Sequence, residues 1–163
     1  MCIAAANYII NAANKYNEGK TELKDRIFMS SKRLQKILFF SDVLYMIENN
    51  GQSMFSDDYY AWPSGPVIPS VYDEFMEYQN GKMYPHDDKP HEKLTDKMIN
   101  TIDRVLIQTN GIGTVELVEK SHENGGPWFF VYGNGKDTNR VIDKNMIYNY
   151  YKEKGAPYGQ LRI

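Results

Sequence analysis

Residues 31–50, SKRLQKILFFSDVLYMIENN, constrain the fold of this chain more than any other stretch of its sequence. Between positions 37 and 47 every residue except Ser41 and Asp42 is apolar, and Gly51 follows as a stop signal. An α-helix built from this stretch has no face suited to water, so other parts of the chain have to cover it on most sides. We therefore predict a buried helix at the centre of the domain.

The remaining sequence supplies further helices to surround it. Apolar residues recur at spacings of three and four, and glycines, prolines and capping side chains mark the ends. We expect helices at about 2–16, 31–50, 70–80, 95–110, 114–122 and 143–154, capped by Ser30 or Ser31, Ser70, Thr95, Thr114 and Asp143. The aromatic stretches 54–62 and 128–132 have the composition of short strands or extended loops. The sequence thus predicts a mainly α fold, a compact bundle of about six helices with at most a small β element.

Length and composition fit one domain over residues 1–163, with an irregular tail from about residue 155. The chain is 42% hydrophobic, and a chain of this length buries roughly 70% of its unfolded surface. The single cysteine, Cys2, cannot form an internal disulfide, and no apolar run approaches the ~18 residues of a membrane span. We expect a cytoplasmic protein that does not enter a membrane.

The charge distribution disfavours a nucleic-acid-binding protein. The net charge of −2 gives no general attraction to nucleic acid, although residues 20–36 hold six basic and two acidic residues. Lys32, Arg33 and Lys36 open the central helix, but apolar residues follow them, so this helix is poorly suited to a DNA groove. Basic decoration of the surface is the preferred interpretation, and a phage-associated regulator that binds nucleic acid is an alternative.

No strong catalytic or nucleotide-binding motif is present in the sequence. The GIGT stretch at 111–114 is better explained by a glycine that ends one helix and a threonine that caps the next. His86, Asp87, Asp88 and His91 fall within six residues, but without the spacing of a zinc site. We expect a polar loop there, and predict neither a metal nor a cofactor.

Ser121, His122 and Glu123 are the residues most suggestive of an unrecognised enzyme site. Catalytic partners converge in space rather than in sequence, so their adjacency alone does not support a nucleophilic site. A histidine that hydrogen-bonds loop backbone near Trp128 is the plainer interpretation, and an enzyme built around His122 is kept as a second alternative.

Residues 61–75, AWPSGPVIPSVYDEF, place three prolines and a glycine around a tryptophan and then continue into a helical pattern. Pro69 prevents this helix from extending backwards, and Gly65 permits the turn before it. A rigid loop with bulky apolar side chains suits a catalytic wall, a docking surface or a corner that the core requires.

The longer stretch LQKILFFSDVLYMIENNGQSMFSDDYYAWPSGPVIPSVYDEF resembles the signature of the SocA-like or Panacea domain family, whose phage-associated members are called GepA. That signature is an L-Q-K-L-L-Y-F-like helix, a G-x-P-L-F-like turn and A-W-x-x-G-P-V-x-P-x-V-Y. The later SHENGGPW is similar to the family's T-H-x-x-x-P-W element, and RVIDKNMI fits its closing element. The chain departs from the pattern at Pro63, at Ser121 and in the insertion Asn124, Gly125 and Gly126.

The resemblance implies an antitoxin-like protein-binding module, not an enzyme, that neutralises a cognate toxin protein in a bacterial or prophage toxin–antitoxin pair. One branch of the family resembles a proteolytic adaptor that delivers its bound toxin to the ClpXP protease. The residues that the resemblance marks as partner-binding or as fixing the corner are Trp62, Gly65, Pro66, Val67, Pro69, Tyr72, His122, Pro127 and Trp128. Between these two roles, we favour fixing the corner.

Overall fold

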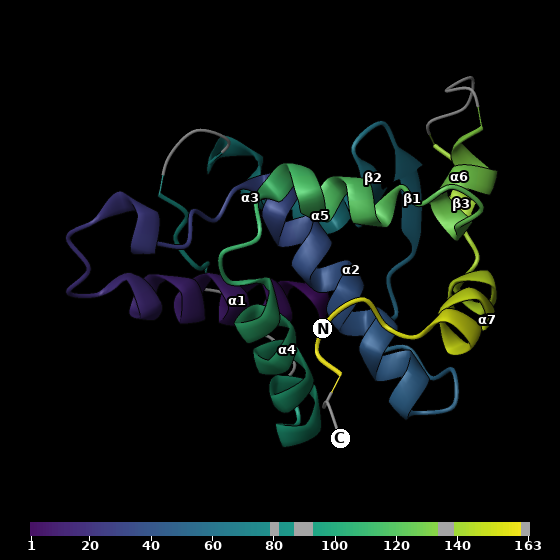
Figure 1. Cartoon of the computed structure of the whole chain (residues 1–163), viewed down its shortest axis with the longest axis horizontal. Coiled ribbons are helices and arrows are strands. Elements are labelled where there is room, and N and C mark those ends of the chain that lie inside the picture. Colours follow the sequence, from purple (N-terminus) through teal and green to yellow (C-terminus); the bar gives the residue numbers. More distant parts are fainter. Residues whose placement is uncertain (79–81, 87–92, 134–138, 161–163) are drawn as a thin grey trace.

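The computed structural model describes residues 1–78, 82–86, 93–133 and 139–160. Within these ranges seven α-helices accompany a small three-stranded antiparallel sheet (Figure 1). The helices are α1 Cys2–Asn17, α2 Ser31–Glu48, α3 Pro69–Phe75, α4 Asp96–Thr109, α5 Thr114–Ser121, α6 Pro127–Tyr132 and α7 Lys144–Lys154. The strands are β1 Tyr59–Trp62, β2 Gly65–Val67 and β3 Val141–Ile142, and 3₁₀ turns lie at Leu23–Asp25 and Met76–Tyr78. The predicted mainly α class is confirmed.

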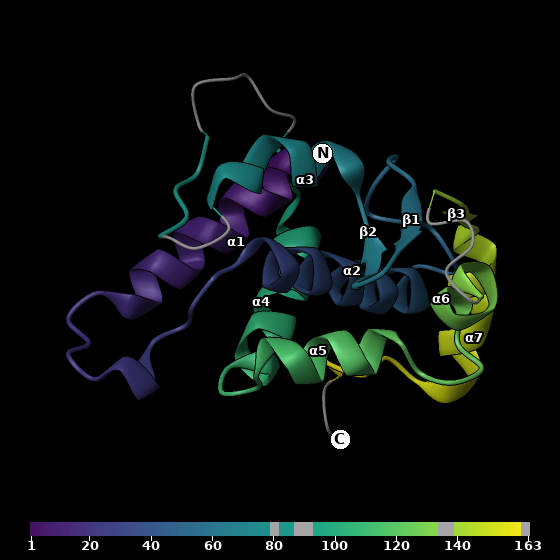
Figure 2. The same cartoon turned by 90° about the horizontal axis from the view of Figure 1, so that it is seen from above.

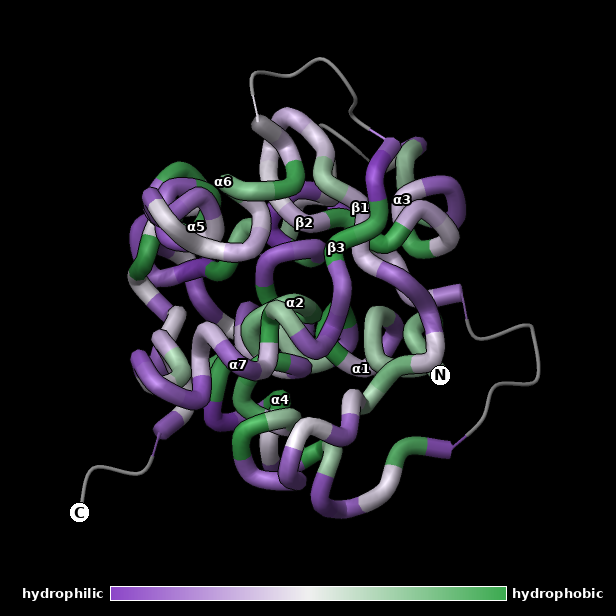
Figure 3. The backbone as a smooth tube through the Cα atoms, turned by 90° about the vertical axis from the view of Figure 1, so that its right-hand side faces the viewer, coloured by the Kyte–Doolittle hydropathy of each residue, from purple (hydrophilic) through white to green (hydrophobic). Residues whose placement is uncertain are grey.

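Helix α2 crosses the middle of the molecule, with the β1–β2 hairpin and α3 along one side and α4 and α5 along the other (Figure 2). From Ser31 to Met46 every residue except Lys32 is buried. Figure 3 shows this largely apolar helix surrounded by the other elements. Ser30 caps it, because its Oγ accepts the backbone N–H of Arg33 at 3.2 Å. The central position predicted for this helix is confirmed.

The stiff stretch after β1 is a tight hairpin. Strands β1 and β2 pair antiparallel with Trp62 opposite Gly65, so only Pro63 and Ser64 form the turn. Gly65 has φ +104°, a conformation that residues with a Cβ rarely adopt. Strand β3 pairs with the other edge of β1, and β2 packs on α2. The hairpin is therefore fixed to the central helix.

The segment between α2 and β1 is held by a buried carboxylate. Asp42 of α2 is fully buried and accepts hydrogen bonds from Ser53 Oγ, the Met54 backbone N–H and Tyr59 Oη. Burial raises the pKa of Asp42 to about 6 despite these bonds. An otherwise apolar helix thus carries a polar group that positions the chain entering β1.

The expected cap of α3 is wrong. Pro69 occupies the first turn of this helix and Ile68 is its N-cap, whereas the Ser70 Oγ donates to Asp57 Oδ1 at 3.0 Å. Proline suits the first helical position because its missing N–H has no partner there in any case. The helix also ends earlier than expected, at Phe75.

Two expectations in the second half of the chain are also corrected. Gly113, not Thr114, is the N-cap of α5. The stretch from Pro127 to Tyr132 is a short helix rather than a strand, again with proline at its start. By contrast, Thr95 and Asp143 cap α4 and α7 as predicted.

Candidate functional site

Two buried polar side chains on the first half of α2 fix the corner after the hairpin. Gln35, 2% exposed, accepts the Ile68 backbone N–H at 2.9 Å and donates to the Ile68 carbonyl at 3.2 Å. One side-chain amide thus satisfies both backbone groups of a buried residue just before α3. The direction in which α3 leaves the hairpin is therefore set by the central helix.

Lys36 makes the second connection and is 1% exposed. Its ammonium donates to the Pro66 carbonyl oxygen at 2.8 Å. Burial, and after it the positive charge of Lys32, lowers the pKa of Lys36 from its usual 10.5 to about 7. Among the described residues the Pro66 carbonyl is its one hydrogen-bond partner, and a buried amine with so little polar contact is poorly stabilised as a cation, so it holds its proton weakly.

Gly65 lies directly over this lysine. A Cβ at this position would lie 2.5 Å from Lys36 Nζ and 2.6 Å from Ser121 Oγ. Both the positive φ and the lack of space therefore require glycine here. The close approach brings together the hairpin, α2 and the end of α5, which are far apart in the sequence.

The Pro127–Trp128 element, which the sequence analysis singled out, is hydrogen-bonded to the hairpin. Trp128 Nε1 donates to the Trp62 carbonyl oxygen at 2.8 Å. The Trp62 ring in turn meets the Tyr72 ring edge-to-face, with centroids 5.0 Å apart. Trp62 and Tyr72 are both half-buried, so each keeps part of its ring at the surface.

His122 belongs to a stack of three rings. Its imidazole lies on Trp128 with centroids 3.8 Å apart, and Tyr132 covers the other side of Trp128 at 4.4 Å. Burial and the charge of Lys36 lower the pKa of His122 to about 4, so the ring is neutral at pH 7. At Nε2 the expected hydrogen bond to loop backbone is not made, because this nitrogen is buried and has no hydrogen-bond partner among the described residues.

The alternative of an enzyme around His122 gains no support from this geometry. The Ser121 Oγ donates to the Val118 carbonyl at 2.7 Å and is buried with its residue. Glu123 points away, and its carboxylate binds Lys120, Lys154 and Tyr150. Nucleophile, base and orienting acid have to meet in one pocket, and these side chains diverge.

The basic cluster of α2 is not surface decoration, and that expectation is wrong for two of its three residues. Arg33, 6% exposed, donates to the carbonyl oxygens of Thr109 and Ile112 at 2.9 and 2.7 Å. Arg33 and Lys36 thus both donate to backbone carbonyls of residues far away in the sequence. Of the three basic residues, only Lys32 is exposed. A helix that is apolar on all sides already implied that charged residues within it face the interior.

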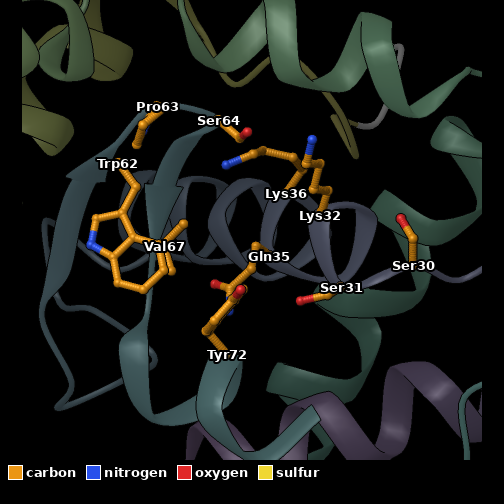
Figure 4. A pocket seen from close by; sticks show the side chains of 10 residues that line it. All are labelled: Ser30, Ser31, Lys32, Gln35, Lys36, Trp62, Pro63, Ser64, Val67 and Tyr72. Atoms are coloured by element: carbon orange, nitrogen blue, oxygen red, sulfur yellow. The ribbon is translucent and has the colours of Figure 1, made fainter. Parts of the chain in front are cut away.

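A pocket of about 440 Å³ opens between the start of α2 and the hairpin. It is lined by Ser30, Ser31, Lys32, Gln35, Lys36, Trp62, Pro63, Ser64, Val67 and Tyr72 (Figure 4). Three of the nine candidate residues, Trp62, Val67 and Tyr72, thus line one pocket. Gly65, Pro66, Pro69, His122, Pro127 and Trp128 are not among the lining residues.

Only part of the polar loop that contains His86 and His91 belongs to the described residues. His86 Nδ1 lies 2.9 Å from Glu74 Oε1, whereas Asp87, Asp88 and His91 lie outside the described residues. Elsewhere in the described part of the chain, no three His, Cys, Asp or Glu side chains are placed to bind one metal ion. Over the same ranges, none of the helices has the length and apolar character needed to span a bilayer.

The family model of the antitoxin SocA-like, Panacea domain matches residues 34–129. The chain belongs to this family. It is 30% identical to Antitoxin SocA of Caulobacter vibrioides, in an alignment that covers 71% of this chain and 69% of the relative. No solved structure matches the chain. The matched residues include most of α2, the whole hairpin and the His122–Trp128 element, so the resemblance predicted from the sequence is confirmed.

Proposed function

We propose that this chain is a cytoplasmic antitoxin, a protein-binding module without catalytic activity that neutralises a cognate toxin protein by forming a complex with it. The observation that carries the proposal is its membership of the antitoxin SocA-like family. The relative from Caulobacter vibrioides is itself named an antitoxin. The buried thiol of Cys2 fits the reducing compartment that the proposal assumes.

The geometry supports binding rather than catalysis. Beside the corner, the two groups with a lowered pKa, Lys36 and His122, both have structural contacts: Lys36 binds the hairpin backbone and His122 lies in a ring stack. Half-exposed aromatic rings beside a pocket are typical anchors of protein interfaces, and Trp62 and Tyr72 have this placement.

A finer version of the proposal is that the chain acts as an adaptor, delivering the bound toxin to a ClpXP-type protease. The family resemblance is its only support. The two versions differ in the fate of the toxin: an adaptor shortens the toxin half-life in cells that contain the protease, whereas simple occlusion leaves it unchanged. Origin in a phage or prophage is a further expectation from the same resemblance.

Co-expression with the adjacent gene tests the proposal. We expect the neighbouring protein to arrest growth when produced alone, and production of this chain to restore growth and to co-purify with it. The matched control is the same vector without this chain. Continued toxicity together with the absence of a complex would refute the antitoxin function.

A further inference from the structure

The pocket beside the hairpin has two chemically different walls. Trp62, Val67 and Tyr72 form an apolar and aromatic wall on one side, and Ser30, Ser31 and Lys32 of the α2 start lie on the other (Figure 4). At about 440 Å³ its volume is within the range of small-ligand pockets, roughly 300–1,000 Å³. A ligand that fills it therefore needs both an apolar and a polar group.

The polar wall favours a negative charge. None of the ten lining residues is acidic, and the exposed Lys32 is basic. The pocket also meets the beginning of an 18-residue helix, where Ser30 satisfies the N–H of Arg33 but the preceding N–H groups have no partner within the helix. In addition, Ser31 is 7% exposed and its hydroxyl makes no hydrogen bond within the described ranges.

We propose that this pocket binds an acidic segment of the partner protein, with an Asp or Glu carboxylate against Lys32 and the first turn of α2. A neighbouring apolar side chain of the same segment packs against Trp62, Val67 and Tyr72. The inference rests on the proposed function for the identity of the partner as a protein.

A carboxylate segment fits better than a nucleic acid. A polyanion needs a broad basic surface, whereas Arg33 and Lys36 are buried and bound to backbone carbonyls. One exposed lysine, one free hydroxyl and one helix start match a single carboxylate. The aromatic wall beside them matches an apolar side chain one or two residues away in the same segment.

The first experiment uses the chain alone. N-acetyl-phenylalanyl-glutamate amide is titrated into the ¹⁵N-labelled chain, and its glutamine counterpart serves as the uncharged probe. We expect the glutamate peptide to shift the backbone amides of Ser31 and Lys32 and the indole N–H of Trp62. The Lys32→Glu variant should lose these shifts. Equal shifts with the glutamine peptide, or shifts confined to another surface, would overturn the inference.

The second experiment uses the complex with the toxin. Lys32→Glu should weaken the Kd about tenfold, because attraction is replaced by repulsion at the rim of the pocket. Lys152→Glu makes the same charge change at an exposed site on α7 and should leave the Kd unchanged. Because Lys32 and Lys152 are both exposed, both variants should keep the melting temperature of the chain.

The two experiments separate the inference from the proposed function. If the complex forms and both variants bind alike, the pocket is not the docking site, although the antitoxin function stands. If the glutamate peptide binds at the pocket but no toxin complex forms, the chemistry of the site is supported and the antitoxin function is refuted.

Discussion

Replacement of Lys36 by methionine should abolish a rise in stability between pH 7 and pH 9. In the folded chain the pKa of Lys36 is lowered from its usual 10.5 to about 7, mainly by burial. In the unfolded chain the amine returns to its usual pKa. Over this interval the unfolded state therefore binds more protons than the folded state, and the free energy of unfolding rises with pH.

The size of the effect follows from the two pKa values. Each pH unit over which one state alone is protonated contributes about 1.4 kcal/mol. Near pH 7 the folded-state amine is still partly protonated, so the rise attributable to Lys36 between pH 7 and pH 9 is about 2 kcal/mol. His122 contributes little, since its pKa of about 4 leaves it neutral in the folded chain throughout this range.

Urea unfolding followed by tryptophan fluorescence at pH 7, 8 and 9 measures this rise. The wild-type chain should gain stability relative to Lys36→Met by about 2 kcal/mol across the series. The thiol of Cys2, whose pKa is raised by burial, contributes equally to the pH dependence of stability in wild type and in Lys36→Met, so its contribution cancels in the comparison. Lys32→Met, at an exposed position, is the control and should retain most of the rise. Parallel curves for wild type and Lys36→Met would refute the account of Lys36 as a buried, weakly protonated amine.

Three further substitutions test how the central helix holds the corner. Gly65→Ala should lower the free energy of unfolding by about 2–4 kcal/mol, because the added Cβ strains the backbone and meets Lys36. Gly111→Ala is the control: Gly111 also has a positive φ but has open space around it, so the substitution should cost only about 1 kcal/mol. Similar urea midpoints for the two variants would contradict this. Gln35→Leu should destabilise the chain by about 1–3 kcal/mol in thermal unfolding, because the buried N–H of Ile68 loses its partner, whereas the Ile68 carbonyl keeps the backbone N–H groups of Val71 and Tyr72; an unchanged melting temperature would contradict it. The pKa of Asp42 is raised to about 6 in the folded chain, so its contribution to stability falls as pH rises from 4 to 6; the stability of wild type relative to Asp42→Asn should drop by about 2 kcal/mol over that range, and a constant difference would contradict the burial argument.

The central helix was predictable because its signal is local. A run that is apolar on every side implies burial whatever surrounds it, and α2 is buried as expected. Helix α4 was equally predictable from the sequence, since Thr95 caps it and apolar residues follow at helical spacing. In both cases the residues that determine the element lie within it.

The short elements were less predictable. Helix α6 has six residues, too few for periodicity to distinguish a helix from a strand, and β3 has two residues whose pairing with β1 depends on contacts distant in the sequence. Proline at position 127 was the available signal for α6, because proline favours the first turn of a helix.

The sequence pattern named residues of the corner but could not give their arrangement. The sequence pattern identified Gly65, whereas the need for glycine arises from Lys36 and Ser121, which lie 29 and 56 positions away. Charged residue types suggested the surface for Arg33 and Lys36, yet both serve as hydrogen-bond donors to buried backbone. The structure separates candidates that line the pocket, such as Tyr72, from those that hold the corner, such as Pro66, and their roles in binding are still predictions.

Calorimetric titration of the purified neighbouring toxin into this chain tests the antitoxin proposal most directly. We expect saturable binding with a Kd of roughly 1 μM or tighter, as for a specific protein complex, and toxin activity that falls as the complex forms. A neighbouring protein that is toxic but shows neither binding heat nor loss of activity on mixing would contradict it.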